Sequence, residues 1–70
     1  MDRATKLAWE LLQFGWDTAY AFSYDPTQEL PFRADRRDGR GSLWAQDPDE
    51  LDELVLRDYA AHPVPREVAP

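Results

Sequence analysis

The chain of 70 residues contains no cysteine. Disulfides, thiolate metal ligands and a cysteine nucleophile are therefore excluded, and nothing in the sequence points to an oxidising compartment. Histidine occurs once, as His62, which lies beside Pro63 near the C-terminus. A general base that works near neutral pH is most often an enclosed histidine, and we do not expect His62 to be enclosed. The sequence therefore predicts neither catalytic residues nor a cofactor.

The chain also lacks long apolar segments: its longest uninterrupted apolar stretches span only a few residues. A transmembrane helix needs about 20 apolar residues, and the N-terminal segment lacks the basic-then-apolar order of a secretion signal. We therefore expect a cytoplasmic protein without a membrane partner. A single core in so short a chain rarely supplies more than about 3–5 kcal/mol of net stability, so a protein partner or a homodimer would be an ordinary way to stabilise it.

Negative charge is abundant but unevenly placed. The chain has 14 acidic and 8 basic residues, a net charge of -6, and five of the six excess negative charges lie after residue 41. Most of these acids lie at the start of a predicted helix or on its outer face, where they favour the positive end of the helix dipole and are solvated. We prefer this structural role over a divalent-metal site, which needs converging oxygens, and over mimicry of DNA phosphates.

Two amphipathic segments predict helices. Residues 2–14 have helical spacing, and Gly15 is the expected end of that helix. Trp9 lies off the centre of the apolar stripe, so we expect it either at the border of the core or partly exposed. The stripe expected to face the core consists of Ala4, Leu7, Ala8, Leu11 and Leu12. The second helix begins at Asp47-Pro48-Asp49-Glu50, an N-cap followed by a proline and a capping-box glutamate, and ends near Ala61 before Pro63.

Alternation with a period of two predicts three strands, over residues 16–24, 32–37 and 42–46. Asp38-Gly39-Arg40-Gly41 predicts a tight hairpin between the last two, because glycine accepts a positive φ. The aromatic face of the first strand is expected to be core. A register shifted by one residue would instead place Tyr20 and Tyr24 on an open sheet face as a docking surface.

The order of these elements predicts an α+β domain over residues 1–62. A three-stranded antiparallel sheet with both helices on one face gives two layers, which lets a short chain bury a common core. Residues 63–70 contain three prolines. We expect these residues to form an extended tail without a core of its own.

A group of arginines is the main candidate for phosphate contact. Guanidinium groups match phosphate oxygens, and a neighbouring Trp44 could stack on a base. Two aspartates among the arginines and the net charge of -6 argue against this role. We therefore favour a solvated hairpin with paired arginines, and keep nucleic-acid binding by residues 33–40 and Trp44 as the alternative. The arginines are Arg33, Arg36, Arg37 and Arg40.

Parts of the chain resemble known groups of proteins. About half of the chain resembles short actinobacterial proteins of no known activity. The resemblance lies in residues 36–39, 43–45, 48–51, 58–59 and 63–66. Residues 32–54 resemble the strand-strand-helix part of HicB-type antitoxin domains. The element order is similar to that of double-stranded-RNA-binding domains, but Asp47-Pro48-Asp49-Glu50 stands at their lysine-rich helix start and would repel phosphates. These resemblances imply a helix-strand-strand-strand-helix domain and no particular activity.

The combined expectation is a small non-enzymatic protein-interaction or regulatory protein. It would act through its sheet face or sheet edge, on a partner protein or a second copy. The candidate binding residues are Arg33, Arg36, Arg37, Arg40, Trp44, Tyr20 and Tyr24.

Overall fold

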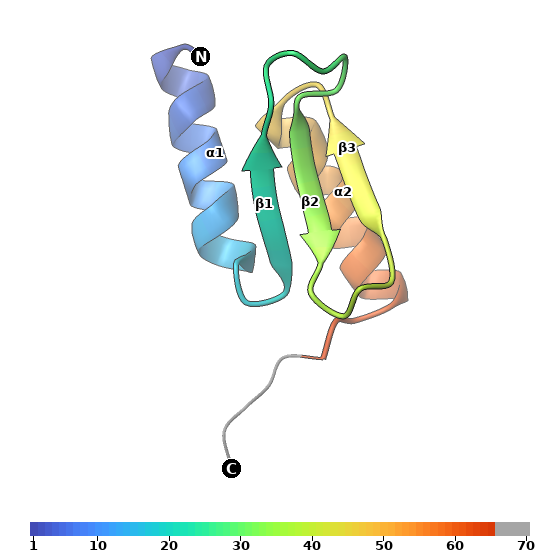
Figure 1. The fold of residues 1–70 in the computed structure, drawn as a ribbon. Coiled ribbons are helices and arrows are strands. Elements are labelled where there is room, and N and C mark those ends of the chain that lie inside the picture. Colours follow the sequence, from blue (N-terminus) through green and yellow to red (C-terminus); the bar gives the residue numbers. More distant parts are fainter. Residues whose placement is uncertain (66–70) are drawn as a thin grey trace.

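The computed structural model describes residues 1–65 and confirms the predicted α+β architecture. The three strands form one antiparallel sheet in the order β1-β2-β3. In Figure 1, α2 lies behind the sheet and α1 runs alongside β1. The elements are α1 (Arg3–Trp16), β1 (Tyr20–Tyr24), β2 (Phe32–Arg36), β3 (Ser42–Ala45) and α2 (Pro48–Ala61).

The start of α2 and the β2–β3 hairpin follow the predicted local chemistry. A side-chain oxygen of Asp47 accepts a hydrogen bond from the Glu50 N–H at 2.8 Å, and Pro48 occupies the first turn. In the hairpin, Gly39 has a φ of 76°, and the Arg36 N–H donates to the carbonyl of Gly41 at 2.9 Å. Both predictions are confirmed because each depends only on residues close together in the chain.

Helix α1 extends beyond its expected end at Gly15. Asp2 caps its start by accepting a hydrogen bond from the Thr5 N–H at 2.7 Å, but the helix ends at Trp16 and Gly15 lies inside it. The extra residue carries the Trp16 ring to 5.1 Å from that of Tyr59 on α2. The prediction of a strand starting at residue 16 was therefore wrong, because the aromatic ring at that position packs from the helix.

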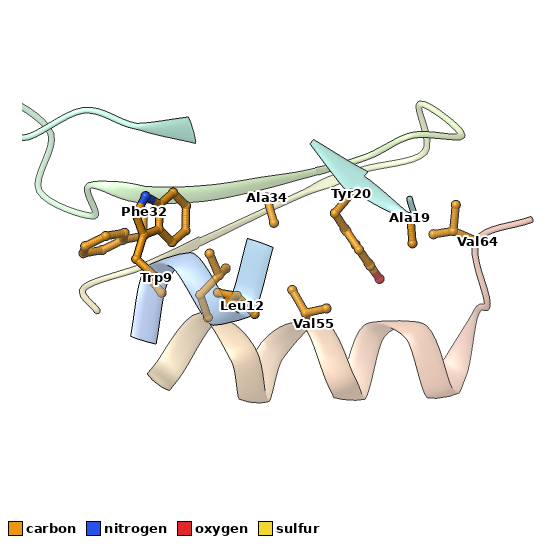
Figure 2. Close-up of a cluster of buried hydrophobic side chains, with 10 residues drawn as sticks. Trp9, Leu12, Ala19, Tyr20, Phe32, Ala34, Val55 and Val64 are labelled. Atoms are coloured by element: carbon orange, nitrogen blue, oxygen red, sulfur yellow. The ribbon is translucent and has the colours of Figure 1, made fainter. Parts of the chain in front are cut away.

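The core lies between the helices and the inner face of the sheet. Figure 2 shows the buried core side chains above α2, with Trp9 beside Phe32. In the register, Phe32 pairs with Ala45, and Tyr20 is fully buried. The aromatic face of β1 therefore faces the helices, as expected, and the alternative with Tyr20 on an open face is wrong. The buried set is Trp9, Leu12, Ala19, Tyr20, Phe32, Ala34, Ala45, Leu51, Val55 and Val64.

Helix α1 buries only part of the predicted apolar stripe, together with a residue expected at its border. Trp9 and Leu12 are buried, whereas Leu11 is 63% exposed and Phe14 is 85% exposed. The Trp9 ring meets Phe32 edge to face, with ring centroids 4.9 Å apart. Aromatic side chains bury more apolar area than leucine and gain further from such contacts. The sheet therefore selects the tryptophan side of α1. Leu12 of the expected stripe is buried as predicted, whereas Ala4, Leu7 and Leu11 are exposed.

Val64 belongs to the core although it follows the last helix. It is almost fully buried and lies beside Ala19 (Figure 2). Val64, which the sequence analysis places in the tail, therefore packs into the core of the domain. The remainder of the predicted tail, residues 66–70, lies outside the described residues.

Candidate functional site

The open face of the sheet brings two of the predicted binding residues together. The Arg33 guanidinium lies 5.3 Å from the ring centroid of Trp44, which is 47% exposed. This contact follows from the register, which pairs the two residues across β2 and β3. Asp35 shares the face and accepts a hydrogen bond from the Arg33 Nε at 2.8 Å and another from the Ser42 hydroxyl. The face thus presents a stacked cation whose charge is already paired.

Arg36 lies inside the molecule in a cluster that joins the sheet to α2. Its Nε and Nη2 donate to the two carboxylate oxygens of Asp38 at 3.1 and 2.7 Å, and its Nη1 donates to Asp58 at 2.6 Å. The Tyr20 hydroxyl donates to the same Asp58 oxygen at 2.5 Å. We call Tyr20, Arg36, Asp38 and Asp58 the Arg36 cluster. Two of the predicted binding residues, Tyr20 and Arg36, are therefore structural.

The Arg36 cluster shifts the pKa values of Tyr20 and Arg36. Burial, followed by the hydrogen bond to Asp58, raises the pKa of Tyr20 well above its ordinary value, so the phenol stays neutral. The hydrogen bonds to Asp38, then those to Asp58, raise the pKa of Arg36, which stays charged. Within residues 1–65 no buried side-chain polar atom lacks a hydrogen-bond partner. The cluster therefore satisfies its hydrogen bonds internally and holds the sheet to α2.

An open pocket of about 690 Å³ adjoins the Arg36 cluster. It is bordered by Arg40, His62 and Pro65 as well as by cluster residues. Asp38 and Asp58 pair with Arg36 there, so this arginine offers an anion little unpaired positive charge. In the described part of the chain, no three acidic or histidine side chains converge closely enough to hold a metal ion.

The remaining predicted residues lie apart from one another. The Arg37 Nε donates to the carbonyl of Asp17 at 2.5 Å, and the Arg40 N–H donates to Asp38 at 3.0 Å. Tyr24 lies on the helix side of the sheet, with its ring 4.8 Å from that of Phe32. The seven candidate residues therefore do not form one site, and only Arg33 and Trp44 share a surface contact.

The surface feature that the sequence analysis missed is an apolar stripe on the outside of α1. Its members are exposed and lie three or four residues apart, which places them on one helix face. We call Ala4, Leu7, Leu11 and Phe14 the α1 stripe. The signal was present in the sequence: α1 has one apolar face with Trp9 and Leu12 and a second with these four residues, and only one of the two can cover the sheet.

A shallow groove runs between the α1 stripe and the start of α2. Its volume is about 270 Å³, and its lining includes Leu11 and Gly15 from α1 and Pro48, Asp49 and Asp52 from α2. The helix layer thus presents an apolar ridge beside a small acidic groove.

Acid is expected to destabilise the fold through Asp38 and Asp35. Hydrogen bonds from Arg36 lower the pKa of Asp38, and the Ser42 hydroxyl, followed by Arg33, lowers that of Asp35, both from 3.8. Because the folded pKa values lie below the unfolded ones, this stabilisation is complete above pH 3.8 and is lost as the pH falls through the folded values. We expect the midpoint temperature of thermal unfolding to fall when the pH is lowered below about 4. Circular dichroism measures this midpoint.

The matched variant for this pH dependence is Asp38→Asn. It should start from a lower midpoint at pH 7 and lose less on acidification than the parent chain, because one of the linked carboxylates is gone. A midpoint that stays level from pH 4 to pH 2 would contradict the assignment.

Comparison of the chain with protein-family models, curated proteins and solved structures found no match. Neither helix of the described residues combines the length and the apolar content that crossing a membrane requires. The functional argument therefore rests on the chain's own surface.

Proposed function

We propose that this chain is a non-enzymatic protein-interaction protein that docks another helix on the α1 stripe. The observation that carries the proposal is the exposure of Phe14 and Leu11 in line with Leu7 on a helix whose other apolar face already covers the sheet. Proteins that stay monomeric rarely expose contiguous apolar ridges, and aromatic residues are enriched at the centres of interfaces. A helix is the expected occupant, because apolar residues spaced by three and four match a helix–helix seam.

The non-enzymatic part of the proposal is supported by what the candidate groups already do. Tyr20, Arg36 and Asp58 are bound to one another, and the chain has no cysteine and a single histidine. A regulatory role through binding fits a small acidic domain whose polar groups are used to hold its elements together.

The open sheet face supports a second candidate, nucleic-acid binding. The stacked Arg33–Trp44 pair is the observation that favours it, since arginine and tryptophan together can stack on a base. Asp35 pairs with Arg33, and the net charge of -6 opposes approach to a phosphate backbone. We therefore prefer protein docking on the α1 stripe over nucleic-acid binding on the open sheet face.

Site-specific photocrosslinking in the native host distinguishes these surfaces. A photoreactive phenylalanine analogue replaces Phe14 in one variant and Trp44 in the other; both positions are aromatic and exposed. We expect position 14 to give a covalent adduct with a polypeptide, and position 44 to give none. Both substitutions are on the surface and should leave the fold intact.

The other outcomes are equally informative. A protein adduct at position 44 alone would move the docking surface to the open sheet face, and a nucleic-acid adduct there would establish the second candidate. Absence of an adduct at both positions would overturn docking by either surface.

A further inference from the structure

We infer that the helix covering the α1 stripe is α1 of a second copy, running antiparallel across a two-fold axis. The inference rests on the proposed function and adds the identity and the orientation of the occupant. It is drawn from three properties of the stripe: its spacing, the sizes of its side chains and the charges beside it.

The spacing of the α1 stripe is the same from either end. Its four members are separated by three, four and three residues. Two copies that run antiparallel can therefore align all four levels, which is what an isologous two-fold interface requires. In this alignment Ala4 lies opposite Phe14 of the second copy, and Leu7 lies opposite Leu11.

The side-chain sizes favour this antiparallel order over a parallel one. The antiparallel alignment places the smallest side chain of the stripe, Ala4, opposite the largest, Phe14, and two leucines opposite each other. Apolar interfaces pack best when large and small residues face each other. A parallel pair would place Phe14 against Phe14 at one end and Ala4 against Ala4 at the other, which crowds one level and leaves a gap in another.

The charges beside the stripe favour the same orientation. The exposed basic residues of α1, Arg3 and Lys6, lie in its first half beside the N-cap Asp2. The C-cap Asp17 follows its second half. An antiparallel pair brings Arg3 and Lys6 of one copy toward Asp17 of the other, whereas a parallel pair would align each basic residue with its own copy. The helix dipoles are also opposed favourably when the helices run antiparallel. Glu10 lies nearest the two-fold axis, where the two copies of this residue approach each other.

The length of α1 sets the strength of the dimer. A helix of 14 residues is about 21 Å long, so one helix pair covers less than the ~800 Å² per partner of a standard interface. The dimer should therefore exchange with the monomer as the concentration changes. Sedimentation equilibrium from about 1 μM to about 1 mM, the range of weak to moderate affinities, should show the mass rising from 8.1 kDa toward twice that value.

Charged substitutions locate the interface. Phe14→Glu and Leu11→Glu should keep the circular dichroism of the parent chain and remain monomeric throughout this range, whereas Trp44→Glu on the opposite layer should dimerise like the parent. Glu10→Gln should tighten the dimer several-fold, because it removes the like-charge contact near the axis. A dimer that persists in Phe14→Glu would place the interface elsewhere and overturn the inference.

The absence of cysteine makes orientation directly measurable. Leu7→Cys and Leu11→Cys chains of different tag length are mixed under mild oxidation. An antiparallel pair forms mainly the mixed disulfide, because residues 7 and 11 face each other, whereas a parallel pair forms mainly the two same-site disulfides. The same mixture in urea gives the random ratio for comparison, and a same-site excess over it would overturn the antiparallel arrangement.

The outcomes separate this inference from the proposed function. A parent chain that stays monomeric at about 1 mM overturns the homodimer, while a photoadduct at position 14 with another polypeptide keeps the docking function. A photoadduct whose mass is that of two copies supports both. Absence of any adduct at position 14 together with a monomeric mass overturns both.

Discussion

Leu12→Ala is expected to remove most of the folding stability of this chain, whereas Leu11→Ala, one position earlier, is expected to leave it nearly unchanged. Leu12 is 5% exposed in the core, and Leu11 is 63% exposed on the α1 stripe. Truncating a buried leucine to alanine costs about 2.7–5 kcal/mol, and a core of this size supplies only about 3–5 kcal/mol in total. Urea unfolding followed by tryptophan fluorescence measures both free energies of unfolding.

The two variants control for each other. They make the same chemical change in the same helix, so differences in helix propensity cancel and burial alone remains. The measurement belongs at low micromolar concentration, because dimerisation through the α1 stripe would add a concentration-dependent stabilisation that Leu11→Ala removes. Equal losses of stability in the two variants would mean that α1 packs with a different face from the one described.

The α1 helix shows where prediction from sequence stops. Hydrophobic periodicity correctly indicates a helix, but α1 carries two apolar faces of similar length. The sheet decides between them, because Trp9 reaches Phe22 and Phe32, whose rings lie 5.7 and 4.9 Å from its own. These contacts join residues more than ten positions apart, so no local rule could select the tryptophan face.

Local chemistry predicts the rest of the frame well. The Asp47 cap and the Gly39 turn both involve residues close in sequence. The same rules fail for Arg36, which was expected at the surface with its neighbours. Its second carboxylate partner, Asp58, comes from α2, 22 residues further along the chain.

The Arg36 cluster also explains why the small sheet keeps its second helix in place. The start of α2 is held by its own cap, and its later turns are held by the hydrogen bonds of Asp58 to Tyr20 on β1 and to Arg36 on β2. The cluster thus ties the three elements that the apolar core also joins. Removing one member should therefore affect the whole fold rather than one helix end.

Asp58→Ala is expected to destabilise the fold by about 2–3 kcal/mol, since it leaves two buried donors without their acceptor. Those donors are the Tyr20 hydroxyl and the Arg36 Nη1, and the Arg36 side chain is only 6% exposed. Alanine is the better helix former, so the loss cannot come from helix propensity. The measurement is the urea midpoint, with the slope of the transition checked for a change in the unfolded state.

Two controls make this second prediction specific. Glu53→Ala removes an ion pair from the same helix, the exposed contact between Glu53 and Arg57 at 2.6 Å, and should cost less than about 0.5 kcal/mol. Tyr20→Phe should lower the free energy of unfolding by about 1 kcal/mol in the parent chain. In the Asp58→Ala chain the same substitution should leave this free energy unchanged or raise it, because the hydroxyl has already lost its acceptor. If the losses of stability in Tyr20→Phe and Asp58→Ala simply add, the two side chains are not coupled. The hydrogen bond between them would then not hold β1 to α2 as described.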